Sequence, residues 1–196
     1  MGQDQNTTIF DTVTKISGHL CKTDTGEHAM LLYDDATSFR DIYSSHCKKA
    51  LQGEGNSVMI LYHYEVKASV IQTLKEVELD VENREKDGSL IMIDASEILS
   101  KSENIVDFLR YLMTAEMAMK KRGKMRLDII VDMGCFYHLS RVDEIPKFEE
   151  SISARTNKES TIICCYHSKD FQRMDEGPRE NIRSHHMKSF AIVQDG

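Results

Sequence analysis

The strongest constraint on the fold is an alternation of short apolar runs with longer segments in which apolar residues recur at helical spacing. Strands that alternate with helices in this way form βαβ units around a parallel sheet. We therefore predict an α/β fold: a three-layer sandwich with a mostly parallel central sheet of about six strands. The predicted strands are residues 28–33, 57–63, 89–94, 127–132, 160–167 and 189–193.

The most regular of the intervening segments runs from about residue 102 to residue 122. The sequence S-K-S-E at 100–103 has the spacing of a capping box, and an apolar stripe that includes Ile105, Phe108 and Leu112 follows it. Gly123 stands where a glycine commonly ends a helix. Further helices are predicted at 39–51, 66–77, 143–154 and 178–186.

The chain of 196 residues contains no proline-rich linker, internal repeat or low-complexity tract. Before residue 27 the sequence is polar, and its apolar residues, among them Ile9, Phe10, Ile16 and Leu20, have roughly helical spacing. We therefore predict an N-terminal extension over 1–26 with a short helix, and a single domain over 27–196.

Composition and charge argue against several classes of protein. A formal net charge of −7 gives no basic surface for phosphates, so we expect no direct nucleic-acid binding. No apolar run approaches the roughly 20 residues that cross a bilayer, and we expect a cytoplasmic protein without a membrane partner. The five cysteines are odd in number and form no C-x-x-C pair, which argues against a disulfide framework and against a structural zinc site.

Aromatic and ionisable residues end the predicted strands. In an open parallel sheet the carboxyl ends of the strands lie along one edge, where ligands bind. Asp34, Asp35 and Asp94 also stand at strand ends, but capping the next helix is an alternative role for them. The candidates for a ligand site at this edge are Tyr33, Tyr62, His63, Tyr64, Asp132, Tyr166 and His167.

The segment 57–77 and the run 127–132 follow the order of the phosphate-loop strand and the acidic metal-holding strand of P-loop ATPases. Residues 62–69 read Y-H-Y-E-V-K-A-S, however, and lack the glycines that let backbone N–H groups surround phosphates. We expect Tyr62, Tyr64 and Glu65 to occupy the space of a triphosphate, and Glu65 to repel it. Conventional ATP hydrolysis is therefore not expected.

Several segments carry a family resemblance: H-A-M-L-L-Y-D-D at 28–35, G-N-S-V-M-I-L-Y at 55–62, D-G-S-L-I-M-I-D-A-S at 87–96, C-C-Y-H at 164–167 and H-H at 185–186. In their order and spacing they resemble the MEDS sensory domains, named for methanogens, methylotrophs and the dichloromethane regulator. The resemblance covers about residues 26–194. It implies a RecA- and KaiC-like fold without a phosphate loop, and a sensor of small, often C1 or halogenated hydrocarbon compounds.

The resemblance also implies roles for single residues. His28 and Tyr33 match the family's opening His and aromatic positions, and Tyr166 matches the Tyr of its C-x-Y-D motif. Asp132 stands where the family usually has Glu, and Met133 matches the Met that follows it.

Two departures concern histidines. His167 replaces the family's usual Asp, and the usual His-Pro before the last strand reads S-H-H-M here. Either His185 or His186 can therefore be the counterpart of the family's histidine, and the ligand preference can differ from that of other members.

Three functions compete, and a pure protein-interaction domain that transmits a signal through an oligomer is a further alternative. The sequence favours a non-enzymatic sensor of a small apolar or C1-type ligand, bordered by tyrosines and Met133, whose output comes from a separate protein such as a kinase or a transcription regulator. A residual ATPase with magnesium on Asp132 is the third choice. The sequence names no cofactor and is compatible with a homo-oligomer. The second choice is a metal or metal-cofactor site drawn from His28, His63, His167, His185, His186, Asp132 and Cys135, none of which shows a diagnostic close spacing.

Overall fold

A computed structural model describes residues 7–10, 16, 19–20, 26–154 and 160–192. Within these ranges the chain forms a seven-stranded, fully parallel sheet with the strand order β1-β7-β2-β6-β5-β3-β4. The predicted α/β fold and its parallel sheet are thereby confirmed. The strands are β1 (Thr7–Phe10), β2 (His28–Tyr33), β3 (Asn56–Tyr62), β4 (Leu90–Asp94), β5 (Arg126–Asp132), β6 (Ser160–His167) and β7 (Lys188–Ile192).

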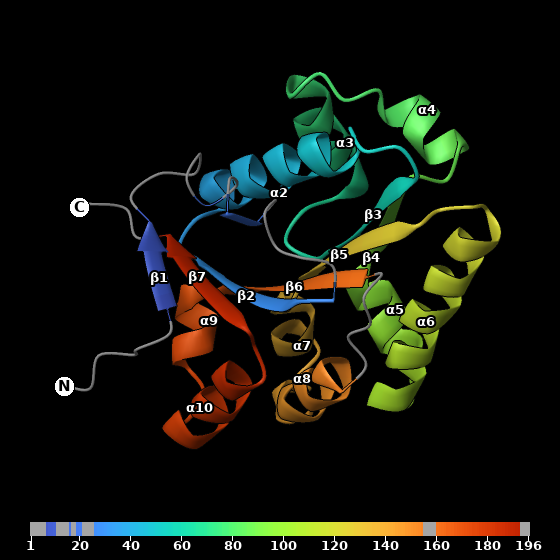
Figure 1. Cartoon of the computed structure of the whole chain (residues 1–196). Coiled ribbons are helices and arrows are strands. Elements are labelled where there is room, and N and C mark those ends of the chain that lie inside the picture. The colour runs from blue at the N-terminus through green and yellow to red at the C-terminus, as the bar shows by residue number, and fades with distance from the viewer. Residues whose placement is uncertain (1–6, 11–15, 17–18, 21–25, 155–159, 193–196) are drawn as a thin grey trace.

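Helices cover both faces of the sheet, which gives the molecule three layers (Figure 1). On the upper face in Figure 1 lie α2 (Ala36–Ala50), α3 (Lys67–Glu76) and α4 (Val81–Lys86). The lower face carries α5 (Ala95–Lys101), α6 (Ile105–Lys121), α7 (Gly134–His138), the short η1 (Val142–Glu144), α8 (Ile145–Ser153), α9 (Ser168–Gln172) and α10 (Glu176–Ser184).

The central strands are buried on both faces because helices pack above and below them. Successive side chains of a strand point to opposite faces, so β6 contributes alternately to two cores. Cys164 belongs to the lower core and Cys165 to the upper one, as expected for neighbours on a strand. This burial explains why the strands read as continuous apolar runs.

The N-terminal segment departs from the predicted arrangement. Thr7–Phe10 forms a strand that pairs in parallel with β7, so that Ile9 and Phe10 are not helical. A run of four residues is too short to show the two-residue period of a strand, and the neighbouring apolar residues suggested a helix instead. Ile16 and Leu20, further along, are helical and buried.

The predicted capping box at 100–103 is wrong, although the helix that it introduced is present. Ser100 lies inside α5, and Asn104 begins α6 by accepting hydrogen bonds from the backbone N–H groups of Val106 (2.9 Å) and Asp107 (3.3 Å). Asparagine is as good an N-cap as serine, and it stands directly before the apolar stripe. Gly123 follows the end of α6 with a positive φ of 78°, as predicted.

The short helices α4, α5, α7 and α9 were not predicted. Each has five to seven residues, which is too few for an apolar period to be recognised. No helix in the described part of the chain is both long enough and apolar enough to cross a membrane.

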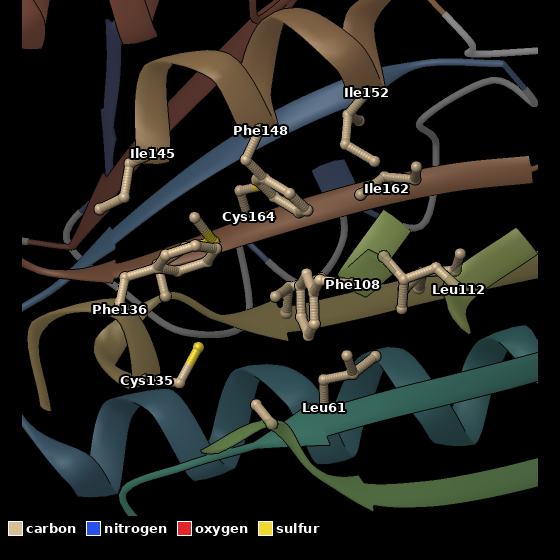
Figure 2. Packing of buried hydrophobic residues seen from close by; sticks show 14 of the residues in the cluster. Leu61, Phe108, Leu112, Cys135, Phe136, Ile145, Phe148, Ile152, Ile162 and Cys164 are labelled. Carbon is tan, nitrogen blue, oxygen red and sulfur yellow. The ribbon is translucent and has the colours of Figure 1, made fainter. Parts of the chain in front are cut away.

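Three phenylalanines from different helices fill the centre of the lower core (Figure 2). The ring of Phe108 in α6 lies 5.9 Å from that of Phe136 in α7 and 5.8 Å from that of Phe148 in α8, measured between centroids. Phe136 and Phe148 are 5.5 Å apart. Aromatic pairs at these separations add to the stabilisation that burial provides. The triad therefore fixes α6, α7 and α8 against the sheet.

Replacing Phe108 by alanine should lower the free energy of unfolding by about 3–5 kcal/mol, because it leaves a cavity inside the triad. Denaturant unfolding followed by circular dichroism measures this loss. Val106→Ala, on the exposed side of the same helix, is the matched control and should change stability by about 0.5 kcal/mol or less. Equal losses in the two variants would contradict this account of the core.

Candidate functional site

Asp132, at the carboxyl end of β5, is the centre of a polar cluster at the carboxyl edge. Its side chain is only 1% exposed. One carboxylate oxygen accepts hydrogen bonds from the backbone N–H of Gly134 (3.0 Å) and from the Tyr33 hydroxyl (3.5 Å). The other accepts from the backbone N–H of Tyr64 (3.1 Å). A single carboxylate thus joins the ends of β2, β3 and β5.

Burial raises the pKa of Asp132 to about 6, while the backbone N–H groups of Tyr64 and Gly134 act in the opposite direction. Desolvation dominates because those donors are neutral and supply only partial positive charge. Burial also raises the pKa of Tyr33, and the neighbouring carboxylate of Asp132 raises it further. At neutral pH the pair therefore consists of a carboxylate and a neutral phenol.

Tyr64 and His63 lie across the turn that follows β5. A Cβ atom added at Gly134 would come within 2.3 Å of the Tyr64 ring and 2.8 Å of the His63 ring, so only glycine fits beneath them. The Tyr64 hydroxyl donates a hydrogen bond to Asp170 on α9. Tyr64 therefore connects the loop after β3 to the helix after β6.

The histidines at this edge make separate contacts. His63 is hydrogen-bonded through Nδ1 to the Ser96 hydroxyl (2.6 Å), and its ring lies 5.1 Å from that of His138. Burial lowers the pKa of His63, and His138 lowers it further. His167 begins α9, where its Nδ1 accepts a hydrogen bond from the backbone N–H of Lys169 (3.2 Å), and it meets the Tyr33 ring edge-on at 5.4 Å.

An open depression of about 680 Å³ lies beside Tyr64. Two aromatic rings and four polar side chains of α9 and its surroundings supply its walls. The lining residues are Tyr64, His167, Lys169, Asp170, Gln172 and Arg173.

Other residues of the predicted edge site do not face this depression. Tyr33 and Tyr166 lie at the same end of the sheet, but Tyr33 belongs to the upper core and Tyr166 to the lower one. Met133 is completely buried in the lower core, and Tyr62 packs against the upper core. The structure therefore groups Tyr33, His63, Tyr64, Asp132 and His167, and separates Tyr62, Met133 and Tyr166 from them.

The expected electrostatic role of Glu65 is not what the structure shows. Its carboxylate accepts hydrogen bonds from Arg40 (2.8 Å) and Tyr43 (3.2 Å) on α2, and from Ser69 (2.6 Å) on α3. Arg40 neutralises its charge, so Glu65 does not repel an anion at the edge. Lys67, which has the place of a phosphate-loop lysine, forms an ion pair with Glu85 at 2.8 Å.

A second polar cluster lies inside the lower layer, under β2 and β6. It contains His28, Glu149, Cys164 and His186, all of them buried, and one ligand-type atom of each lies within 4.8 Å of those of the others. Nε2 of His28 is 2.9 Å from Glu149 Oε2 and 3.4 Å from Cys164 Sγ. Nε2 of His186 is 3.3 Å from the same carboxylate oxygen. The two imidazole rings are 4.0 Å apart.

Surrounding groups orient these side chains. The Tyr166 hydroxyl donates to Oε1 of Glu149, which leaves Oε2 for the cluster. Burial alone would raise the pKa of Glu149, but the neighbouring His186 and His28 hold it well below its ordinary range. Burial lowers the pKa of His28. A completely buried carboxylate thus faces two imidazoles.

The structure distributes the predicted metal-site residues over different places. His28 and His186 meet in this second cluster, whereas His185 contributes only its backbone carbonyl, and His63, His167 and Asp132 belong to the edge cluster. Cys135 packs in the lower core. Glu149 was not predicted because it stands on a helix with no motif around it, although a glutamate on the buried side of a helix next to Phe148 and Ile152 was a usable signal.

Comparison with known proteins gives a family and a fold. The family model described as "MEthanogen/methylotroph, DcmR Sensory domain" (MEDS) matches residues 27–186. A KaiC-like protein of the hyperthermophilic archaeon Pyrococcus horikoshii has a similar crystal structure, with a TM-score of 0.62 at 14% identity over 87% of this chain and 73% of that chain. No curated protein matches the sequence. The solved structure shows that the fold is KaiC-like.

The raised pKa of Asp132 predicts a pH-dependent stability. The folded protein binds the proton of the Asp132 carboxyl more tightly than the unfolded chain does. The contribution of Asp132 to the free energy of unfolding is therefore greatest below about pH 4 and is lost as the pH rises through about 6. The difference in unfolding free energy between the wild type and Asp132→Asn should therefore decrease by about 2–3 kcal/mol from about pH 4 to about pH 7.

Denaturant unfolding at a series of pH values measures this difference. Tyr33→Phe is the control, since it removes one hydrogen bond but keeps the carboxylate and its titration. A difference between the wild type and Asp132→Asn that stays constant with pH would show that Asp132 has an ordinary pKa.

Proposed function

The chain belongs to the family of MEDS sensory domains, and from this premise we propose that it binds a small organic molecule at the carboxyl edge of its sheet, beside Tyr64. The observation that carries the proposal is the position of Tyr64. This side chain follows the end of β3, is 47% exposed, and forms one wall of the open depression. A ligand that enters the depression meets Tyr64 directly.

Tyr64 is held by contacts that a ligand can alter. Its hydroxyl is bonded to Asp170, and Asp170 also forms an ion pair with Arg173 (3.4 Å). Both partners line the depression, so a bound molecule competes with the Tyr64–Asp170 hydrogen bond. Breaking that bond would release the loop after β3 from α9.

The backbone of Tyr64 provides a route from the ligand to the rest of the molecule. Its N–H is bonded to Asp132, and Asp132 also accepts from Tyr33, which stacks on Phe39 of α2 with ring centroids 4.4 Å apart. A displacement of Tyr64 would therefore change the hydrogen bonds that position Tyr33 and α2. We expect a separate output protein, such as a kinase or a transcription regulator, to respond to this change.

The lining favours a ligand with an apolar part and a polar group. The rings of Tyr64 and His167 offer apolar surface, while Lys169, Asp170 and Arg173 offer charge. The depression is open and has the volume of an ordinary ligand pocket, so a C1-type compound would fill it only if Tyr64 closed over it.

The edge is poorly suited to a magnesium nucleotide. Both oxygens of Asp132 already accept hydrogen bonds from the protein, and residues 62–69 contain no glycine whose backbone N–H could approach phosphates closely. Lys67 is paired with Glu85 on the neighbouring helix. These contacts favour a binding domain over an ATPase.

Thermal unfolding with a panel of halogenated methanes, methanol, methylamine and short carboxylic acids tests the proposed ligand class. A compound that binds the folded state should raise the free energy of unfolding by about 2.7 kcal/mol at 100 times its Kd. Tyr64→Ala should raise the Kd of that compound by about tenfold or more, because the substitution removes one wall of the depression.

Tyr111→Ala is the control for this experiment, since Tyr111 is a similarly exposed tyrosine on α6. It should leave the Kd unchanged. A compound that binds the wild type and Tyr64→Ala equally well would place the ligand elsewhere in the molecule, and a panel without binders would count against the proposed ligand class.

Calorimetry with magnesium ATP tests the competing function. Wild type should show no binding tighter than the millimolar range, and Lys67→Ala should behave identically because Lys67 is held by Glu85. Micromolar binding that is lost in Lys67→Ala would favour a nucleotide-dependent protein instead.

A further inference from the structure

We infer that His28, Glu149, Cys164 and His186 form a closed tetrahedral site for a divalent transition-metal ion of the zinc type. The four residues come from β2, α8, β6 and the segment after α10. Their ligand atoms converge on one point between the sheet and the helices of the lower layer. The inference rests on this geometry and does not depend on the proposed ligand at the carboxyl edge.

The hydrogen bonds of the two histidines fix which ring nitrogen carries a proton. Nδ1 of His28 is 3.1 Å from the carbonyl oxygen of His185, and Nδ1 of His186 is 2.8 Å from that of Ile182. A carbonyl oxygen only accepts hydrogen bonds, so each Nδ1 must donate. In the neutral rings each Nε2 therefore carries a lone pair. Metal-binding histidines are commonly oriented in this way, with the other ring nitrogen bonded to a carbonyl.

Both lone pairs point to a group that is also an acceptor. Nε2 of each ring faces Oε2 of Glu149, and among the described residues Nε2 of His186 makes no hydrogen bond at all. Protonating both rings would place two cations 4.0 Å apart in the interior, which burial disfavours. At least one imidazole lone pair is thus directed at a carboxylate lone pair. A cation between them turns this repulsion into attraction.

The distances between the four groups fit a small metal ion. With bonds of about 2.0 Å to nitrogen and oxygen and about 2.3 Å to sulfur, the ligands of a tetrahedral zinc ion lie roughly 3.3–3.6 Å from one another. Here His186 and Cys164 are 3.3 and 3.5 Å from Glu149 Oε2, and His28 is 3.4 Å from Cys164 Sγ. The contact between His28 and Glu149 is shorter, at 2.9 Å, and would widen by a few tenths of an ångström. The four ligand atoms all lie within 4.8 Å of one another.

The donor set indicates the class of ion. Imidazole and thiolate ligands suit zinc and similar borderline-soft ions, and disfavour magnesium and calcium. A dication with the Glu149 carboxylate and a Cys164 thiolate forms a neutral unit, which can be buried at a much lower cost than an isolated charge. Four protein ligands without solvent contact make the site a closed one, as in structural zinc sites.

The absence of a C-x-x-C pair argues against a structural zinc site built on paired cysteines. It does not exclude a site with a single cysteine. The present site takes one cysteine; Glu149 lies 15 residues before it, His186 follows it, and His28 lies 136 residues before it. Uptake of the ion must release the proton of the Cys164 thiol, because the thiolate is the form that binds metal. Tyr166 supports the site from outside by its hydrogen bond to Glu149.

The test uses the full chain, unfolded with a chelator and then refolded without metal, because the site is closed. Isothermal titration should show uptake of one zinc ion per chain, and one cobalt(II) ion should give the strong visible absorption of tetrahedral cobalt together with a near-ultraviolet thiolate band. Cys164→Ser should lose the thiolate band and bind zinc about tenfold or more weakly. Tyr166→Phe should keep the tetrahedral spectrum and lower the zinc affinity by about 10–100-fold.

Cys135→Ser is the matched control, because Cys135 is also a buried thiol of the lower core but lies outside the cluster. It should retain the spectrum and affinity of the wild type. Failure of the refolded wild type to take up zinc, an octahedral cobalt spectrum, or a thiolate band that persists in Cys164→Ser would each overturn the assignment. If Cys164→Ser does not fold, the wild-type cobalt spectrum decides, since a thiolate band supports the site and an octahedral spectrum without one refutes it.

Discussion

The parallel course of all the strands is the constraint on which the rest of this structure depends. A parallel connection must cross over the sheet, and the helices that make these crossovers cover both faces, so the central strands have no side that meets water. The same geometry brings every carboxyl end to one edge. Side chains from β2, β3 and β5 can therefore meet at Asp132, although their sequence positions are about 30 to 100 residues apart.

Two buried carboxylates, Asp132 and Glu149, show that the neighbouring groups determine whether burial raises or lowers the pKa of a carboxyl group. Asp132 is surrounded by neutral donors, and its pKa is raised because partial charges do not compensate for the loss of water. Glu149 lies even deeper, yet its pKa is lowered because two imidazoles face it. Asp132 consequently connects the ends of three strands through neutral donors, whereas Glu149 faces two imidazoles and the Cys164 thiol. The two clusters are joined through the lower layer, since Tyr166 contacts Glu149 and its ring packs on Phe171 of α9.

The loop after β3 differs from a phosphate loop in its sequence and in its contacts. A phosphate loop depends on glycines because its backbone must approach the phosphates closely. Residues 62–69, after β3, contain no glycine, and the ring of Tyr64 lies over Gly134 in the turn after β5. The edge that would surround phosphates is therefore filled by an aromatic side chain. Hydrogen bonds connect Tyr64 to Asp132 and Asp132 to Tyr33, and Tyr33 packs on Phe39 of α2.

The sequence by itself determined the fold class and most of its elements, because apolar runs and helical periods are local consequences of burial. It placed β2 and β6 at their observed bounds and Gly123 at the end of α6. By the rule that parallel strands share an edge, it grouped seven residues, of which the structure brings five together and separates Tyr62 and Tyr166. It could not assign Thr7–Phe10 to the sheet, since four residues carry no period and their partner β7 is at the other end of the chain.

Only the tertiary structure decided which face each strand-end side chain takes and which distant residues meet. Tyr33 and Tyr166 lie at the same end but enter different cores, because their strands present them to opposite faces. His28, Glu149, Cys164 and His186 meet because α8 and the turn after α10 pack beneath β2 and β6. No local pattern encodes that meeting, since it depends on the packing of three neighbouring elements against β2, which is more than a hundred residues away in the sequence.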